Sequence, residues 1–332
     1  MGVVADNGAR IRAVMTNYDL CFAWNWEYDL DFFLLLEKSL LSHDLTLLQI
    51  TPDLLPSILM SLAENEVSFR ACFDRASDSD RRFTSVIEWA CRHNVYRINR
   101  FEQASLAWNK AAMHRAVSAA LCTPYTIIIP AYDEDPLLPS IDLRSLGLGF
   151  VMKPAHGGGG DGVVMNVHSM DEVLTIRKEY SDDQYLLQSR IVPVQLGSRP
   201  AWFRVIYCFG RQFLFWWYPG TFYDPVSHSG EEKFDLKFLR RVIDTIAGIC
   251  GLDVFSSEIA LIPDGRFVVI DYVNDPIDLR LQSKTGQGVP DNVICEIAEI
   301  LATRVRDYLY SSQHSAMIAP LGARSGISAS RM

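Results

Sequence analysis

The first hundred residues alternate between two hydrophobic patterns. In one pattern apolar side chains recur every three or four residues, as a helix with one buried face requires; in the other, short runs are rich in aliphatic and aromatic residues. These patterns predict strands at residues 10–18, 45–51, 68–74 and 95–99, and helices at 29–42 and 81–93. Strands separated by helices form a parallel sheet with both faces covered. We therefore expect a parallel α/β domain over residues 1–98.

A different pattern follows, in which short strands succeed one another as hairpins. A long helical pattern at 101–121 comes first, then a strand after Pro124 and a loop over 131–148. Because Pro124 cannot continue the helix, it separates the helix from the strand. Paired strands are predicted at 149–154 and 163–168, at 201–209 and 212–218, and at 255–262 and 267–273, with helices at 234–251 and 290–310.

These elements suggest a division of the chain after residue 98. We expect a central lobe with a glycine-rich hairpin over 99–183 and a C-terminal lobe over 184–310. The tail, 311–332, is rich in Ser, Ala and Gly, and we expect it to be disordered. The fold class predicted for the whole chain is α/β, with antiparallel sheets in the two lobes after the parallel domain.

Composition narrows the class of protein. The chain has 332 residues, 49% of them hydrophobic, so it can bury a sizeable core. Its net charge of −9 argues against a nucleic-acid surface, because neutralising phosphates needs clustered Lys and Arg. The seven scattered cysteines form no C-x-x-C pair, which predicts reduced thiols. With no bilayer-spanning apolar run and no signal peptide, we expect a cytoplasmic protein that binds neither nucleic acid nor membrane.

The stretch FVMKPAHGGGGDGVV, residues 150–164, carries the strongest chemical signal. Gly157, Gly159 and Gly162 match G-x-G-x-x-G, but that dinucleotide motif needs a helix after it, and here a strand follows. No G-K-[ST] closes the run, so a P-loop is also excluded. A hairpin with a glycine tip remains, whose backbone could approach a polyphosphate while Lys153 supplies positive charge. The alternative is a mobile loop that binds nothing.

Two acidic residues lie on strands that a short turn pairs. Glu258 belongs to SSEIALI and Asp271 to VVIDYV, on either side of the turn PDGR, and Asn274 follows. Antiparallel pairing brings such residues side by side. Carboxylate and amide oxygens are the ligands that Mg²⁺ uses beside nucleotide phosphates. The alternative is a pair of capped or exposed carboxylates at the ends of a sheet.

Taken in order, these motifs resemble the ATP-grasp superfamily. The layout is closest to the branch of glutathione synthetase and the ribosomal-protein-S6 glutamate ligases, and the resemblance covers residues 99–310. Residues 1–98 resemble the Rossmann-like domain that precedes the grasp in that family. The segments that carry the resemblance are WNKAAMHRAV with TPYT, FVMKPAHGGGGDGV, YLLQSRIV, AWFRVIYCFG and the two strands with Glu258 and Asp271.

The resemblance implies a role for each matching residue. Lys110 would touch the α phosphate, and Lys153 would bind the α and β phosphates. The glycines would cover the β and γ phosphates, and the Gln188 segment would hold adenine. The implied nucleotide-binding residues are Lys110, Lys153, Gly157, Gly158, Gly159, Gly160, Gln188, Arg190 and Ile191. The implied metal ligands are Glu258, Asp271 and Asn274. The implied catalytic residues are Arg204, facing the γ-phosphate, and Arg280, near the acyl-phosphate.

Some residues depart from the family pattern. Asn109 replaces an Asp, and Gln188 stands where a Glu is frequent. Asn274 follows the acid by three residues where the family usually has two, so either a bulge restores its direction or Asp275 shares the role. Simpler explanations also remain: Lys110 as a solvated lysine, and Arg204 and Arg280 as ordinary ion-pair residues. Three tryptophans are expected to pack between strands on the pleated surface: Trp202, Trp216 and Trp217.

The resemblance implies an ATP-dependent ligase that forms a C–N bond. Such an enzyme joins a carboxylate to an amine, or to a thiol, through an acyl-phosphate, and it uses ATP with one or two Mg²⁺ ions, or Mn²⁺. Its substrates would be small molecules, such as amino acids or a short peptide, and a homodimer is compatible with the family. The alternatives are a small-molecule kinase on the same scaffold and a non-catalytic nucleotide-binding protein. Substrate choice is expected to depend on two loops, 74–80 and 219–231. The alternative for loop 74–80 is that it only caps a helix.

Overall fold

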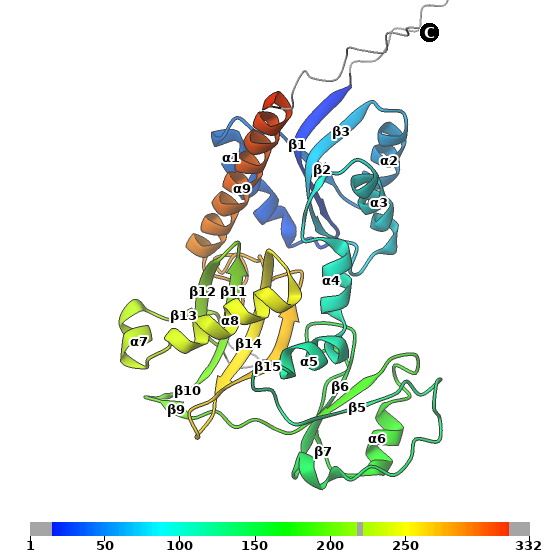
Figure 1. Cartoon of the computed structure of the whole chain (residues 1–332), viewed down its shortest axis with the longest axis vertical. Helices are drawn as coiled ribbons and strands as arrows, with labels where there is room; N and C mark the ends of the chain where they lie inside the picture. Colours follow the sequence, from blue (N-terminus) through cyan, green and yellow to red (C-terminus); the bar gives the residue numbers. More distant parts are fainter. Residues whose placement is uncertain (1–14, 218–221, 319–332) are drawn as a thin grey trace, which may run out of the picture.

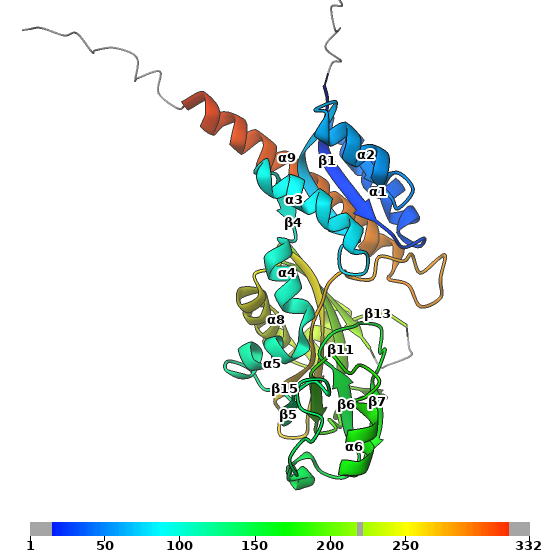
Figure 2. The ribbon, with the colours of Figure 1, turned by 90° about the vertical axis from the view of Figure 1, so that its right-hand side faces the viewer.

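The computed structural model describes residues 15–217 and 222–318, with side chains through residue 311. An N-terminal domain, a C-terminal lobe and a central lobe follow one another along the long axis (Figures 1 and 2). The N-terminal domain has a parallel sheet in the order β2-β1-β3-β4. Its strands are β1 (Thr16–Trp24), β2 (Leu47–Ile50), β3 (Val67–Arg75) and β4 (Tyr96–Ile98). This arrangement confirms the predicted parallel α/β domain, although residues 10–14 of the first predicted strand lie outside the described ranges.

Helices cover both faces of the parallel sheet. They are α1 (Asp29–Ser42), α2 (Leu55–Ala63), the 3-10 turn Arg81–Phe83, α3 (Thr84–Arg92) and the C-terminal α9 (Asp291–Ile318). Although α9 comes last in the chain, it returns to the N-terminal domain and packs along α1 (Figure 1). The face that it buries includes Ile294, Ile297 and Leu301. Residues 311–332 were predicted to be a disordered tail, but α9 continues to Ile318, because no Gly or Pro interrupts the helix before Pro320. The rest of that tail, 319–332, lies outside the described ranges.

The long helix predicted at 101–121 is instead two helices, α4 (Phe101–Trp108) and α5 (Lys110–Ser118). The break is at Asn109, whose backbone is extended and whose side chain accepts a hydrogen bond from the Ala112 N–H. Asparagine is a preferred N-cap because its side-chain oxygen satisfies an otherwise unpaired amide of the first turn. The cap starts a new helix in a new direction, and Lys110 becomes its first residue.

The central lobe contains an antiparallel sheet in the order β5-β8-β6-β7. Its elements are β5 (Thr126–Ile129), the 3-10 turn Leu143–Leu146, β6 (Phe150–Pro154), β7 (Val164–Val167), α6 (Met170–Ile176) and β8 (Tyr185–Gln188). The buried side chains of one sheet face pack against α6. Because β8 pairs with β5 and β6, this sheet extends past the boundary predicted at 183/184, and the connection to the next lobe comes after Gln188.

The C-terminal lobe contains an antiparallel sheet in the order β13-β12-β11-β14-β15. Its strands are β11 (Trp202–Cys208), β12 (Arg211–Trp216), β13 (Asp224–Pro225), β14 (Val254–Leu261) and β15 (Phe267–Asn274). Other elements are β9 (Gln195–Leu196), β10 (Arg199–Pro200), α7 (His228–Lys233) and α8 (Lys237–Cys250). Helices α4, α5 and α8 pack on one face of the sheet, which leaves the other face for the site residues. None of the helices in the described ranges has the length and apolarity needed to cross a membrane.

Candidate active site

Lys153 lies at the end of β6 and connects the two antiparallel sheets. Its Nζ donates to the backbone carbonyl of Ile270 on β15 at 3.1 Å, and the residue is 6% exposed. Burial is the largest effect on this ammonium and lowers its pKa; Lys110 lowers it further, while Asp271 and Glu258 raise it. A buried cation is costly without a compensating anion. Because its hydrogen-bond partner is a neutral carbonyl, Lys153 is suited to receive an anionic ligand such as a phosphate.

The four consecutive glycines form the tip of the hairpin between β6 and β7. Gly157, Gly159 and Gly160 have positive φ angles of 91°, 63° and 85°, which other residues rarely adopt. A Cβ atom at any of these positions would meet nothing within 4 Å. Glycine is therefore needed here for the backbone turn and not for tight packing. The open tip exposes its backbone, as a loop that covers a polyphosphate would require.

The base of this hairpin is held by the start of α5. The amide of Lys110 donates to the Ala155 carbonyl at 2.7 Å, and its Nζ donates to the carbonyl of Gly157. On the other side, His156 donates through its backbone N–H to Asp183 at 2.7 Å, and its Nδ1 lies 2.9 Å from the same carboxylate. The first predicted lysine thus lies beside the glycine loop, while its contact with a nucleotide stays a prediction.

Glu258 and Asp271 face each other as register partners on β14 and β15. Glu258 Oε1 lies 3.2 Å from Nη1 of Arg204, and Oε2 accepts from Trp202 Nε1 at 3.3 Å. Burial is the largest effect on the pKa of Glu258 and raises it; the neighbouring Asp271 carboxylate raises it further, while Arg204 lowers it. Two adjacent, partly buried carboxylates repel each other, and a divalent cation between them would relieve that repulsion. The donor set therefore fits a Mg²⁺ ion.

The pairing of β14 with β15 explains how Asn274 can serve although it follows Asp271 by three residues and not by two. Ser256 pairs with Asn274 and Glu258 pairs with Asp271, so two steps on β14 match three steps on β15. The extra residue makes a bulge, which returns Asn274 to the face that carries the two acids. Asp275 instead accepts a hydrogen bond from Asn99 at 2.9 Å. The geometry favours Asn274 over Asp275 as the third oxygen ligand, a role that stays a prediction.

No cluster of three or more His, Cys, Asp or Glu side chains among the described residues is arranged to hold a metal ion. A metal at this site would therefore depend on Glu258, Asp271, an amide oxygen and oxygens from the nucleotide. Mg²⁺ commonly binds in this way, with few protein carboxylates and with substrate phosphates.

The two predicted catalytic arginines lie in different surroundings. Arg204 is partly buried and contacts Glu258, and its Nε and Nη2 lie 3.4 and 3.3 Å from Ser256 Oγ. Arg280 forms a two-point ion pair with Asp278, at 3.0 and 2.8 Å. In this structure Arg280 is therefore an ordinary ion-pair residue, as the simpler explanation predicted. Its approach to a substrate stays a prediction.

Gln188 ends β8, and its side chain is already engaged. Its Nε2 donates to Thr126 Oγ at 3.0 Å and to the Tyr272 hydroxyl at 2.8 Å, and Nδ1 of His114 lies 2.6 Å from that hydroxyl. Burial lowers the pKa of His114, and the nearby Lys153 lowers it further. A neutral imidazole can accept a hydrogen bond from the Tyr272 hydroxyl at Nδ1. This hydrogen-bonded chain orients Gln188. Contact between Gln188 and an adenine amine stays a prediction.

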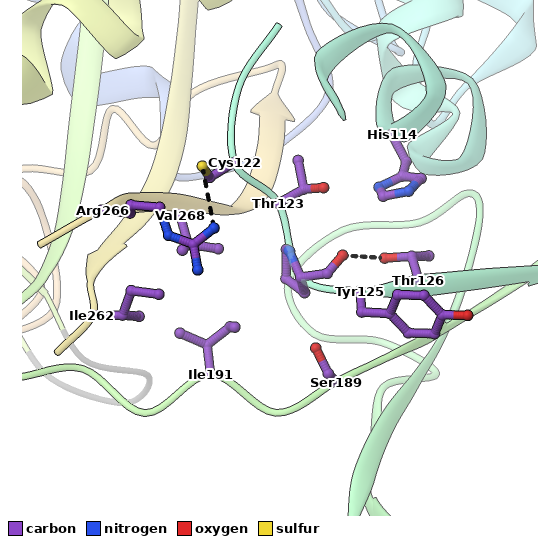
Figure 3. Close-up of a pocket in the computed structure, with 11 residues that line it drawn as sticks. His114, Cys122, Thr123, Tyr125, Thr126, Ser189, Ile191, Ile262, Arg266 and Val268 are labelled. Atoms are coloured by element: carbon purple, nitrogen blue, oxygen red, sulfur yellow. Dashed lines mark hydrogen bonds between the residues drawn. The ribbon is translucent and has the colours of Figure 1, made fainter. Parts of the chain in front are cut away.

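An open pocket of about 520 Å³ lies beside this series of hydrogen bonds, next to residues 188–191, the predicted adenine hinge (Figure 3). His114 and Arg266 enter it from opposite walls, and the segment 122–126 forms part of its lining (Figure 3). Ile191 and Ser189 also line it, whereas the predicted lysines and carboxylates are not among its lining residues within the described ranges. The pocket thus borders the predicted adenine hinge and not the phosphate and metal residues. Arg190, in the same hinge, is exposed.

Several side chains beside the predicted residues were not predicted from the sequence to contact them. Trp202 and Trp217 were expected only to pack between strands, but Trp202 donates to Glu258, and Trp217 lies against the Arg204 guanidinium. The alternation in β11 could have indicated the first contact, because Trp202 and Arg204 share a face. Tyr272 and His114 had no comparable signal, since their contact joins a strand to a helix distant in sequence. Residues 219–221 of the predicted substrate loop lie outside the described residues.

Comparison with known proteins finds likeness in structure only. No protein-family model matches the chain, and no curated protein matches it in sequence. A RimK domain ATP-grasp protein from Sphaerobacter thermophilus matches with a TM-score of 0.59 and 18% identity, over 85% of this chain and 98% of that one.

Two other solved structures were determined with bound ligands. D-alanine–D-alanine ligase from Bacillus anthracis, complexed with ATP, has a TM-score of 0.57 and 12% identity, over 87% of this chain and 98% of that one. The ATP-grasp ligase PsnB, complexed with a minimal precursor, Mg and ADP, has a TM-score of 0.54 and 12% identity, over 86% and 97%. At these identities the likeness concerns the fold. The chain therefore has the ATP-grasp fold that its motifs predicted.

Proposed function

We propose that this protein is an ATP-dependent ligase that joins a carboxylate to an amine, or to a thiol, through an acyl-phosphate. The main support is the convergence of Lys153, Arg204, Glu258 and Asp271 where the two antiparallel sheets meet, beside an open glycine hairpin. The ATP-grasp fold adds support, since one solved ligase of that fold was complexed with ATP and another with Mg and ADP.

In the first step, a carboxylate oxygen of the acid substrate would attack the γ-phosphorus of ATP. The bond from that phosphorus to the β–γ bridging oxygen would break, and ADP would leave. Lys153 would neutralise the phosphates, while the hairpin amides would hold their oxygens. Such a step depends on positioning and on charge stabilisation. Mg²⁺, held by Glu258, Asp271 and Asn274, would supply further positive charge to the β and γ phosphates.

In the second step, the amine nitrogen or thiol sulfur would attack the acyl carbon. Phosphate would leave with the electron pair of the C–O bond, and the nucleophile would lose its proton. Arg204, and Arg280 if it leaves Asp278, would stabilise the negative charge on the tetrahedral oxygen. Because water hydrolyses an acyl-phosphate, the glycine hairpin would have to shield it.

The experiment that tests this function is a product assay. Purified protein is incubated with ATP, Mg²⁺ and pools of amino acids, other small acids and amines, with and without hydroxylamine. A ligase should release ADP and phosphate and yield a hydroxamate, the trapped acyl group. A phosphorylated hydroxyl compound would indicate a kinase instead. Tight ATP binding with no ADP from any pool would indicate a non-catalytic nucleotide-binding protein.

The proposal also defines cofactors and partners. One or two Mg²⁺ ions would accompany ATP, and Mn²⁺ would substitute because it accepts the same oxygen ligands. The acid and the amine would be small molecules or a peptide, and MdnC is a structurally similar protein that was solved with a bound precursor peptide. We also propose that the protein is located in the cytoplasm and forms a homodimer. Gel filtration of the purified chain would test the dimer.

A further inference from the structure

The guanidinium of Arg204 lies against two aromatic rings as well as its polar partners. Its Cζ is 5.0 Å from the ring centroid of Trp217 and 5.8 Å from that of Tyr223. The two rings also contact each other, with centroids 5.0 Å apart. A cation over an aromatic face is attracted by the ring quadrupole, and more strongly when water is excluded. Arg204 is therefore held on its polar side by Glu258 and Ser256 and on its apolar side by the two rings.

Both rings rest on rigid parts of the fold. The Trp217 amide donates to the Trp202 carbonyl at 2.8 Å, which extends the pairing of β12 with β11. The Tyr223 ring is 2% exposed and packs edge-on against Phe215 at 5.2 Å. The Tyr223 carbonyl also accepts from Gln282 at 3.3 Å, two residues after Arg280 in the chain. The rings thus have little freedom to follow the guanidinium if it moves.

Packing alone does not explain a tryptophan at position 217. Its indole Nε1 is buried and has no hydrogen-bond partner among the described residues. A buried N–H without an acceptor lowers stability, and phenylalanine would fill much of the space without that cost. Trp gives the strongest cation–π attraction of the aromatic side chains. The contact with Arg204 gives the indole at this position a role besides packing.

We propose that Trp217 and Tyr223 form an aromatic clamp, a pair of positioning residues that hold the Arg204 guanidinium in the orientation it needs at the γ-phosphate and the reacting acyl group. This inference rests on the proposed ligase function. Without the clamp, only the hydrogen bonds to Glu258 and Ser256 oppose movement of the Arg204 guanidinium, so it can leave this orientation. The loss should therefore appear in kcat, because ATP binding depends on other groups such as Lys153.

Trp217→Leu tests the clamp, and the adjacent Trp216→Leu is its matched control. Trp216 points to the opposite face of β12, where it packs on Phe203 at 4.9 Å and Phe234 at 5.8 Å. We expect Trp217→Leu to lower kcat about 10- to 100-fold, as misplacement of a catalytic group does. KM for ATP should change less than about threefold. Trp217→Phe should recover most of kcat, and Trp216→Leu should keep it despite a similar loss in Tm.

Tyr223→Phe and Tyr223→Leu test the second ring in the same way. The phenylalanine variant keeps the ring and should keep most of kcat, whereas the leucine variant should resemble Trp217→Leu. Wild-type kcat in both Trp217→Leu and Tyr223→Leu would overturn the clamp. An equal loss of kcat in Trp216→Leu would also overturn it, since general loosening of the sheet would then be sufficient.

Crystal structures separate failure of the clamp from failure of the ligase function. In Trp217→Leu the Arg204 guanidinium should be displaced or disordered, and in Trp216→Leu it should keep its contacts with Glu258 and Ser256. An unmoved guanidinium in Trp217→Leu would overturn the clamp whatever the activity. If the wild-type chain made no ADP from any substrate pool, the ligase function would fail, and the crystal structures would still decide on the clamp.

Discussion

At the scale of single residues, the candidate site is built from charges that burial makes costly. Lys153 is almost fully buried against a carbonyl, and Glu258 is partly buried beside Asp271 and Arg204. Folding positions these charges and leaves them only partly neutralised. Residues arranged in this way are typical of functional sites, because a ligand can complete the neutralisation.

The first prediction concerns Asp271. Asp271→Asn keeps the shape of the side chain but removes one of the two facing negative charges, so a divalent cation should bind much more weakly. We expect at least a 10³-fold loss of turnover, as order of magnitude, because the metal would neutralise the transferring phosphoryl group. Circular dichroism and Tm should stay close to wild type. Wild-type turnover in this variant would remove Asp271 from the proposed metal site.

At the scale of elements, the break between α4 and α5 positions Lys110. The Asn109 cap starts α5 beside Ala155, and as a result the lysine reaches the glycine hairpin. A continuous helix over this segment would carry Lys110 in a different direction. The hairpin itself is held at its base by His156 and Asp183.

The second prediction tests the cap. Asn109→Ala should lower the free energy of unfolding by about 1 kcal/mol, since it leaves a first-turn amide without its acceptor. Because Lys110 follows directly, KM for ATP should also rise. Asn109→Asp, the residue usual at this position in the superfamily that the sequence resembles, retains the acceptor and should match wild type in urea denaturation. A loss in Asn109→Asp equal to that in Asn109→Ala would show that the side-chain acceptor is not what matters.

The third prediction is a pH dependence at the hairpin base. The hydrogen bond with Asp183 is the main cause that raises the pKa of His156. A histidine whose folded pKa exceeds its unfolded value contributes stability fully below the unfolded pKa, near 6.5, and loses it as pH rises through the folded pKa.

Wild type should therefore exceed His156→Gln in free energy of unfolding at pH 5.5. We expect a difference of at most about 1 kcal/mol, because the imidazole is more than half exposed and solvent screens it. The difference should shrink as pH rises above the folded pKa. Urea denaturation of both proteins across this range measures it, and a difference that grows with pH would contradict the assignment.

At the scale of the whole molecule, a buried arginine joins the N-terminal domain to the C-terminal lobe. Arg75, at the end of β3, is 4% exposed and binds Asp29, 1% exposed, at 2.8 and 3.1 Å. Its Nη1 also donates to the carbonyl of Ile277 at 2.8 Å. Ile277 belongs to the loop that carries Arg280. Arg75, held by Asp29, thus connects the first domain to the loop that carries Arg280.

The fourth prediction tests this connection. Arg75→Met should lower the free energy of unfolding by about 3–5 kcal/mol, because it leaves the Asp29 carboxylate buried without a counter-charge. In the double variant Arg75→Met with Asp29→Leu no charge remains buried, so most of that stability should return. Chemical denaturation of the wild type, the single variants Arg75→Met and Asp29→Leu, and the double variant gives the coupling energy. A double variant no more stable than Arg75→Met would show that the ion pair does not explain the loss.

Much of the fold and of the candidate site could be predicted because the responsible interactions are local. The glycine hairpin, the short turn between β14 and β15 and the alternation within each strand act over a few residues. The short turn pairs β14 with β15, and a bulge between Glu258 and Ile259 then brings Glu258 opposite Asp271. Two predictions were wrong where local signals competed. The helical pattern at 101–121 predicted one helix, although the Asn109 cap divides it into two. The Ser- and Ala-rich composition after 311 predicted disorder, although α9 continues to Ile318.

The sequence by itself determined the order of elements, the motifs that resemble the ATP-grasp superfamily and the hairpin that places β14 beside β15. Only the tertiary structure decided which distant residues meet. It brings Lys153 to Ile270, Arg75 to Ile277 and α9 back to α1. It also places Trp217 and Tyr223 against Arg204. The physical reason is that hydrogen bonding and alternation act along one strand or turn, whereas contacts between sheets depend on how the whole core packs.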